Sequence, residues 1–200
     1  MQRFFMTILF VLFFSAPSFA QTKAAKAGAD PGQFDFYVLA LSWSPAYCAD
    51  GGVKRSPEQC AAGAMKGFVV HGLWPQYEKG YPISCPTDRK DLPKASFEKA
   101  AALFPDLKLA TSEWRRHGSC TGLEPDLYLD TVAAARDQVK VPASFDPSSL
   151  VSSGSSSLAP ADIEKRFIEA NPKLQPSMMS VSCRKAVLRE VRICFTRDLK

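Results

Sequence analysis

The sequence predicts an α+β fold in a single domain stapled by disulfides. Strand-like and helix-like segments are both present, but they do not alternate strictly, as they would in a doubly wound sheet. Six cysteines stand in a chain of 200 residues. A chain of this length is typical of one domain, which can bury a core without help from repeats or metals.

Four segments have the pattern of strands. They are residues 34–43, 67–72, 177–183 and 185–195. The first, FDFYVLALSW, alternates with apolar groups on both faces, which indicates a strand buried on both sides. The second, GFVVHG, is a short β-branched run ended by glycine and followed by Pro75. The last two segments could form a hairpin, with a disulfide between Cys183 and Cys194 across it.

Helical spacing or composition marks four further segments between these strands. They are residues 96–104, 111–117, 124–139 and 159–171. Pro125 falls in the first turn of the third, where proline is tolerated. The serine-rich segment 142–160 predicts a loop.

Residues 1–20 have the order of features of a secretory signal peptide. An early cation, Arg3, precedes an apolar run, which ends at the small residues around Ala20. The run is shorter than the roughly 20 residues that a membrane span needs. A buried N-terminal helix is the alternative. We expect residues 21–33 to be a flexible lead-in and residues 34–200 to form the domain, exported to the periplasm or the medium.

The cysteine count favours disulfides over metal binding. The six are Cys48, Cys60, Cys85, Cys120, Cys183 and Cys194. An even number in an exported chain indicates a disulfide framework, although the sequence alone does not choose among the possible pairings. No Cys-x-x-Cys pair occurs and the two histidines are far apart, so we expect no zinc site and no other metal.

Net charge says little about partners. The formal charge is +5, from 25 Lys and Arg against 20 Asp and Glu. This is compatible with a polyanionic ligand, but an ordinary basic surface explains it equally well.

The only two histidines lie in two segments that also concentrate tryptophan, glycine and charge. His71 is in FVVHGLWPQ, residues 68–76, and His117 is in SEWRRHGSC, residues 112–120. If residues 111–117 are helical and Gly118 ends the helix, Glu113 and His117 share a face, with Arg116 beside them.

A surface Glu–His pair would be the plainer interpretation of that helix taken alone. His71 changes the balance, because it ends a predicted strand and Trp74 follows at once. Two imidazoles, a carboxylate and a guanidinium are what phosphodiester transfer within RNA requires. One imidazole takes the proton of the 2′-hydroxyl, and the other protonates the departing 5′-oxygen. A guanidinium can meet the charge of the phosphorane, and aromatic rings stack on bases.

FVVHGLWPQ and SEWRRHGSC resemble the two active-site segments of the ribonuclease T2 family, secreted acid endoribonucleases. The usual forms in that family are close to F-x-x-H-G-L-W-P and H-E-W-x-K-H-G-T-C. YVLALSWSPAYC, residues 37–48, is similar to the first strand of the family and its following turn. The resemblance implies an α+β fold with a central antiparallel sheet flanked by helices.

The resemblance also implies a role for each site residue. His71 and His117 would be the acid–base pair, with His117 the base and His71 the acid in the first step. Glu113 would be the catalytic carboxylate, Arg116 the phosphate-binding cation and Trp74 part of a base-binding site. The expected enzyme is a metal-independent endoribonuclease without cofactors that cleaves single-stranded RNA through a 2′,3′-cyclic phosphate. It would spare DNA, act as a monomer and have no membrane contact after signal removal.

Disulfide pairings are implied by the same resemblance. They are Cys48–Cys60, Cys85–Cys120 and Cys183–Cys194.

Among the departures from the family pattern, three concern the expected site. Ser112 stands in place of a third histidine, Arg116 replaces a lysine, and Gln76 stands where an acid is common, so base preference does not carry over. A catalytically weak member that binds RNA or a protein is therefore an alternative. A poorer alternative is an envelope hydrolase with paired carboxylates, which would not depend on His71.

Overall fold

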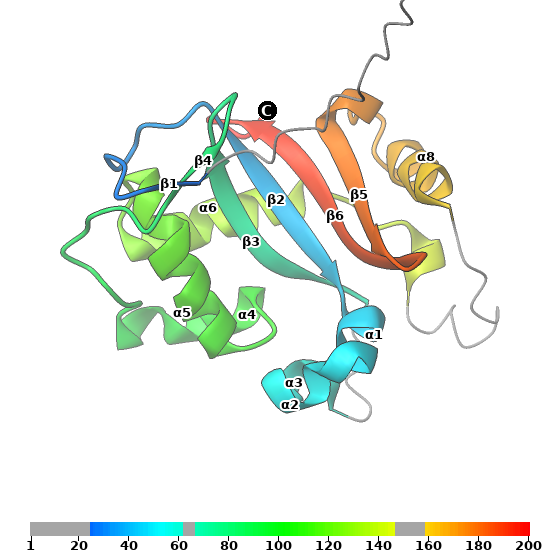
Figure 1. Ribbon diagram of the computed structural model, residues 1–200, viewed down its shortest axis with the longest axis horizontal. Helices are drawn as coiled ribbons and strands as arrows, with labels where there is room; N and C mark the ends of the chain where they lie inside the picture. Colours follow the sequence, from blue (N-terminus) through cyan, green and yellow to red (C-terminus); the bar gives the residue numbers. More distant parts are fainter. Residues whose placement is uncertain (1–24, 62–66, 147–158) are drawn as a thin grey trace, which may run out of the picture.

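A four-stranded antiparallel sheet in the order β3-β2-β6-β5 forms the middle of the molecule (Figure 1). The computed structural model describes residues 25–61, 67–146 and 159–200. The strands are β2 (Phe36–Trp43), β3 (Phe68–Gln76), β5 (Met179–Arg184) and β6 (Val187–Thr196). The predicted α+β class with a central antiparallel sheet is confirmed.

One face of the sheet carries the main hydrophobic core. Leu39 and Leu41 of β2 belong to the main hydrophobic core, together with Val191 and Ile193 of β6. Because side chains alternate along a strand, the intervening residues of β2, such as Ala40, point to the opposite face. β2 is an inner strand whose residues are mostly buried, as its apolar pattern predicts.

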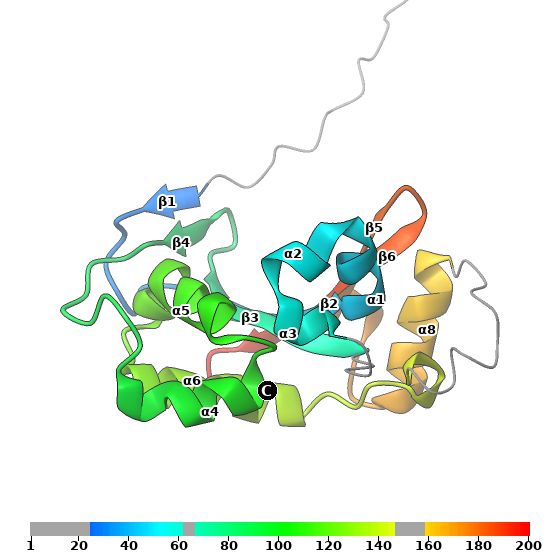
Figure 2. The ribbon, with the colours of Figure 1, turned by 90° about the horizontal axis from the view of Figure 1, so that it is seen from below.

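Helices pack on the core face of the sheet, and others lie beside its two edge strands, α5 next to β3 and α8 next to β5 (Figures 1 and 2). The longer ones are α4 (Phe97–Leu103), α5 (Leu107–Arg116), α6 (Pro125–Asp137) and α8 (Pro160–Ala170). Short helices α1 (Ser44–Tyr47), α2 (Val53–Arg55) and α3 (Pro57–Cys60) follow the end of β2. Tyr128 and Leu129 of α6 and Phe167 of α8 are fully buried in the core. All four predicted helices are present.

Helix α5 begins earlier than the sequence predicts, at Leu107 instead of residue 111. Asp106 caps it, since its Oδ1 accepts the amide N–H of Leu109 at 2.7 Å. The helix ends at Arg116, one residue before the predicted end at His117, and the backbone of Gly118 is not left-handed. A Cβ atom there would clash with Trp114 and Tyr128, so glycine is needed for close packing.

Strand β3 is longer than the predicted strand 67–72, because it continues through Pro75 to Gln76. Proline lacks an N–H and is tolerated in strands at a sheet edge. β3 is an edge strand in the sheet order, so Pro75 does not interrupt it.

Within residues 21–33, predicted as a flexible lead-in, the backbone makes regular main-chain contacts from residue 25 onward. β1 (Ala25–Ala27) pairs in parallel with β4 (Tyr81–Ile83), and the N–H of Gly32 donates to the carbonyl of Cys120 at 2.9 Å. These main-chain bonds leave no signal in a run of small and polar side chains. The predicted signal peptide and most of the loop 142–160 lie outside the described residues.

Two of the three expected disulfides are confirmed. Cys48 is bonded to Cys60 and Cys85 to Cys120. The Cys183–Cys194 bridge is wrong, because the hairpin register pairs Cys183 with Leu188. Cys194 lies six residues further along β6, roughly 20 Å at the usual rise of a strand. A disulfide requires Cα atoms within about 7 Å.

No helix in the described part of the chain is long and apolar enough to cross a membrane.

Candidate active site

His71 occupies a β-bulge in strand β3. Ala40 pairs with Gly72 and Leu41 pairs with Val70, which leaves His71 as an extra residue between them. In a regular ladder His71 would oppose Leu41 and point into the core. The bulge places Val70 in that core position and re-aims the imidazole toward the opposite face of the sheet.

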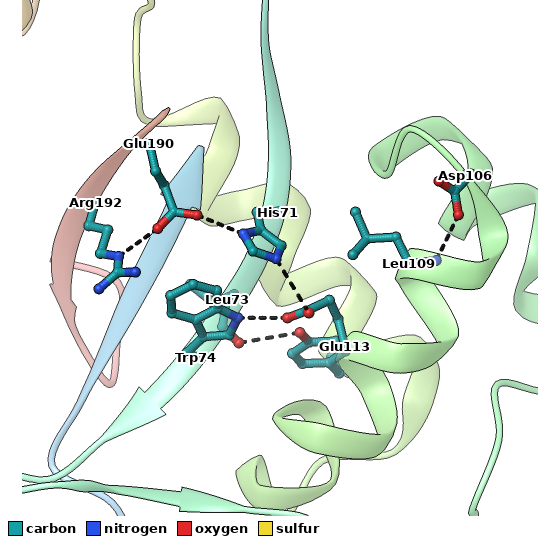
Figure 3. A network of polar contacts seen from close by, with 9 residues as sticks. His71, Leu73, Trp74, Asp106, Leu109, Glu113, Glu190 and Arg192 are labelled. Carbon is teal, nitrogen blue, oxygen red and sulfur yellow. Dashed lines mark hydrogen bonds and ion pairs between the residues drawn. The ribbon is translucent and has the colours of Figure 1, made fainter. Parts of the chain in front are cut away.

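A glutamate from the far side of β2 reaches His71. Oε2 of Glu190, on β6, lies 2.6 Å from Nδ1 of His71, and Oε1 accepts a 2.6 Å hydrogen bond from Nε of Arg192 (Figure 3). Glu190 is buried, with 7% of its surface exposed. The His71 side chain keeps 35% exposure, so its ring is accessible from solvent.

Glu113 approaches His71 from the other side. It lies on α5 and is 4% exposed. Its Oε1 is 3.8 Å from Nε2 of His71, and its Oε2 accepts a 2.6 Å hydrogen bond from Nε1 of Trp74 (Figure 3). A Cβ atom at Gly72 would overlap both Glu113 and Trp74, so the glycine permits this approach.

His117 joins the same cluster from the end of α5. Its N–H donates to the carbonyl of Glu113 at 2.9 Å, and its backbone leaves the helix at that point. The ring centroid of Trp74 is 5.4 Å from that of His117 and 5.2 Å from that of His71. Nδ1 of His117 is buried and has no hydrogen-bond partner among the described residues.

The two imidazoles have opposite electrostatic environments. Burial lowers the pKa of His71, but the hydrogen bond to Glu190 and the charges of Glu113 and Glu190 outweigh burial, so that pKa is raised above its ordinary value. Burial, aided by the charges of Arg116 and His71, lowers the pKa of His117 to about 3. At weakly acidic pH, His71 therefore carries a proton while His117 is neutral.

The two carboxylates also differ. Burial raises the pKa of Glu113 above its ordinary value, although His71, Trp74 and Arg116 oppose the shift. Burial would raise the pKa of Glu190 as well, but the hydrogen bond and charge of His71 and the contacts with Arg192 lower it overall. Glu190 is thus the ionised partner of His71.

The site residues expected from the sequence lie together. Arg116 and Trp74 differ from the others in their exposure and contacts. Arg116 is exposed on α5, near enough for its charge to act on Glu113 and His117. Trp74 is half-buried, and the guanidinium of Arg192 lies over its ring, with Cζ 5.2 Å from the centroid. Part of this ring is therefore already covered.

Glu190 and Arg192 were not predicted as site residues. Their only signal is alternation, since Glu190 and Arg192 flank the core residue Val191 and so point to the opposite face of β6, the face that bears the site. Alternation does not identify which strand lies beside β2, and the contact with His71 depends on that. No cluster of three or more His, Cys, Asp or Glu side chains suited to a metal ion occurs in the part of the chain that the structure describes.

The sequence of the chain is similar to those of known ribonucleases. The chain is 46% identical over 108 residues to "Ribonuclease" of Aeromonas hydrophila, an alignment that covers 54% of this chain and 46% of that protein. The chain thus spans about half the length of this relative. It is 24% identical over 208 residues to "Ribonuclease I" of Escherichia coli, covering 84% of this chain and 77% of that protein.

Solved structures share the fold. A crystal structure of a ribonuclease MC1 variant in complex with 5′-UMP superposes with a TM-score of 0.62 at 20% identity, covering 82% of this chain and 89% of that one. The sequence profile of the ribonuclease T2 family matches residues 34–200. That match includes the sheet, helix α5 and the cluster around His71 and Glu113, and the chain belongs to the ribonuclease T2 family.

Proposed function

We propose that the chain is an endoribonuclease that cleaves single-stranded RNA by transphosphorylation through a 2′,3′-cyclic phosphate. One observation carries the proposal: His71 and His117 contact the same tryptophan, and their pKa values are shifted in opposite directions. An acid and a base of this kind, held side by side, are what the transfer of two protons requires.

In the first step, neutral His117 accepts the proton of the RNA 2′-hydroxyl. The 2′-oxygen attacks phosphorus, and the bond between phosphorus and the 5′-oxygen breaks. Protonated His71 gives its Nε2 proton to the departing 5′-oxygen, so that the ring becomes neutral. Arg116 offers a planar cation to the phosphorane oxygens.

The second step reverses the roles. Neutral His71 takes a proton from water, and the hydroxyl attacks the cyclic phosphate. Protonated His117 returns its proton to the 2′-oxygen as that bond to phosphorus breaks. Because the two imidazoles supply these proton transfers and the guanidinium stabilises the phosphorane, the reaction needs no metal or other cofactor.

Glu113 contacts both His71 and Trp74 in this scheme. Its Oε1 faces Nε2 of His71 at 3.8 Å and favours the protonated ring, while Oε2 fixes the indole of Trp74. Trp74 would form part of the base-binding site, with a nucleobase stacking on the ring surface that Arg192 leaves open. The 5′-UMP complex named above supports nucleotide binding at this fold.

We also propose that the protein is exported and acts as a monomer, with RNA and not DNA as its substrate. The confirmed disulfides Cys48–Cys60 and Cys85–Cys120 support an oxidising compartment. DNA lacks the 2′-hydroxyl that must attack phosphorus, so it should not be cleaved.

The test is digestion of single-stranded RNA by the purified mature protein in excess EDTA. We expect oligonucleotides ending in 2′,3′-cyclic phosphate, and single-stranded DNA of the same sequence should remain intact. Cleavage of DNA at a similar rate, or full loss of activity in the chelator, would contradict the mechanism. Tight RNA binding without cleavage would instead support the catalytically weak member that the Ser112 departure leaves open.

A further inference from the structure

We infer that Glu190, supported by Arg192, is a positioning residue that fixes the ring of His71 with Nε2 directed into the site. The inference rests on the proposed function, in which Nε2 delivers the proton to the leaving oxygen. Neither residue lies in the two histidine-containing segments.

The sheet provides a path for Glu190 to reach His71. Glu190 pairs with Ser42 and Arg192 with Ala40, so the strand between β6 and β3 carries only small side chains at these positions. The glutamate can therefore extend over β2 to the bulge in β3. A larger residue at position 40 or 42 would stand between them.

Both oxygens of Glu190 are occupied by charged partners. Oε2 lies 2.6 Å from Nδ1 of His71 and Oε1 lies 2.6 Å from Nε of Arg192 (Figure 3). A buried carboxylate is costly unless it is paired, and charge-assisted hydrogen bonds to both oxygens satisfy it. Arg192 in turn rests on the ring of Trp74. The result is a continuous chain from Trp74 through Arg192 and Glu190 to His71.

This chain determines which ring nitrogen is available. Nδ1–H donates to Glu190, so Nε2 faces Glu113. A flip of the ring would break the shorter of these two contacts, the one to Glu190. Three charged side chains act on His71 directly: Glu190 and Arg192 from β6 and Glu113 from α5. Arg116 of α5 acts on Glu113. If Glu190 became neutral, Glu113 would remain to favour the imidazolium, and Arg192 would oppose it.

The decisive variant is Glu190→Gln, which keeps the shape of the side chain and removes its charge. The His71 titration would be followed by NMR in the protein without substrate. We expect the pKa of His71 to fall by on the order of one unit, since a carboxylate at this distance shifts a pKa by about 1 to 3 units. The basic limb of kcat/KM against pH should move to lower pH by the same amount, with KM nearly unchanged.

The matched control is Glu169→Gln on α8, which removes the same charge from an exposed pair with Lys165. It should leave both the titration and the pH profile in place. If Glu190→Gln does not fold, Glu190→Asp keeps the charge at a greater distance and should give a smaller shift in the same direction.

An unchanged His71 titration in folded Glu190→Gln would overturn the inference. Absence of RNA cleavage by the unsubstituted protein would overturn the proposed function instead, and it would do so whatever the titration showed.

Discussion

Gly72 lies so close to Glu113 that any side chain at position 72 would occupy the space of the Glu113 carboxylate. The same Cβ atom would overlap Nε1 of Trp74. The hydrogen bond between Trp74 and Glu113 therefore exists only because β3 carries a glycine directly after His71. The HGLW order of the sequence thus has a steric reason.

Gly72→Ala should reduce kcat/KM by roughly tenfold to a hundredfold, because displacement of a site group by about 1 Å can cost this much. Overpacking should also lower the free energy of unfolding by about 1 to 3 kcal/mol. Steady-state kinetics on a dinucleotide and urea titration would measure the two effects.

Gly52→Ala is the control for this variant. Its Cβ would overlap the ring of Tyr47, away from the site, so it should lower stability without a comparable loss of kcat/KM. Equal losses of activity in the two variants, at equal folded fraction, would show that the effect at Gly72 is one of stability alone.

Replacement of either imidazole should strongly reduce the rate. His71→Ala and His117→Ala should each lower kcat by on the order of 10²-fold to 10⁴-fold, the usual range for a positioned acid or base. Circular dichroism would establish that both variants are folded. Two fully active variants would mean that these are structural histidines, and a dependence on Glu113 alone would favour the carboxylate hydrolase.

The pH profile should be bell-shaped and displaced toward acid. The base form of His117 exists above its pKa of about 3, and the acid form of His71 exists below its raised pKa. kcat/KM should therefore fall as pH decreases through about 3 and as pH increases beyond the ordinary histidine value. These limits describe the free enzyme.

A bound phosphodiester adds negative charge next to His117 and should raise its pKa. The acid limb of kcat, which reports the complex, should then lie at higher pH than the acid limb of kcat/KM. Coincident acid limbs would argue against His117 as the base that faces the phosphate.

Much of the fold follows from local patterns in the sequence. The buried strand at residues 36–43 and helix α6, with Pro125 in its first turn, are both readable from periodicity. The pairing of β1 with β4 is not, because it depends on main-chain bonds that any residue can make. The error at Cys183 and Cys194 has a similar origin: a hairpin is predictable, but its register depends on a turn at Lys185 and Ala186, where both residues have positive φ.

The site divides in the same way. His71, Trp74, Glu113 and His117 lie in two short segments whose side chains converge, so local spacing is informative. Glu190 lies 119 residues from His71 and reaches it only because β6 lies beside β2. No spacing rule predicts a contact that depends on strand order.

The disulfides provide a separate test of the fold. Cys85→Ala with Cys120→Ala opens a loop of 35 residues and should lower the free energy of unfolding by about 4 kcal/mol. Cys183→Ser, at a half-buried position of β5, should change it by much less, about 1 kcal/mol, because no bridge is lost. Peptide mapping without reduction should yield Cys48–Cys60 and Cys85–Cys120. A peptide that joins Cys183 to Cys194 would require a different register for β5 and β6.

The last prediction concerns the exposed residue Ser112, one turn before Arg116 on α5. Ser112→His would add a donor that is cationic below about pH 6.5 and could meet the charge of the transition state. A charge-assisted hydrogen bond contributes about 1.5 to 3 kcal/mol, but repulsion from Arg116 opposes it, so a gain of roughly tenfold in kcat/KM is the upper limit. The gain should vanish as pH rises past neutrality, where the new imidazole loses its charge.

The control is Ser112→Gln, which cannot be charged and should show no such pH dependence. Equal profiles for the two folded variants would mean that position 112 does not face the scissile phosphate.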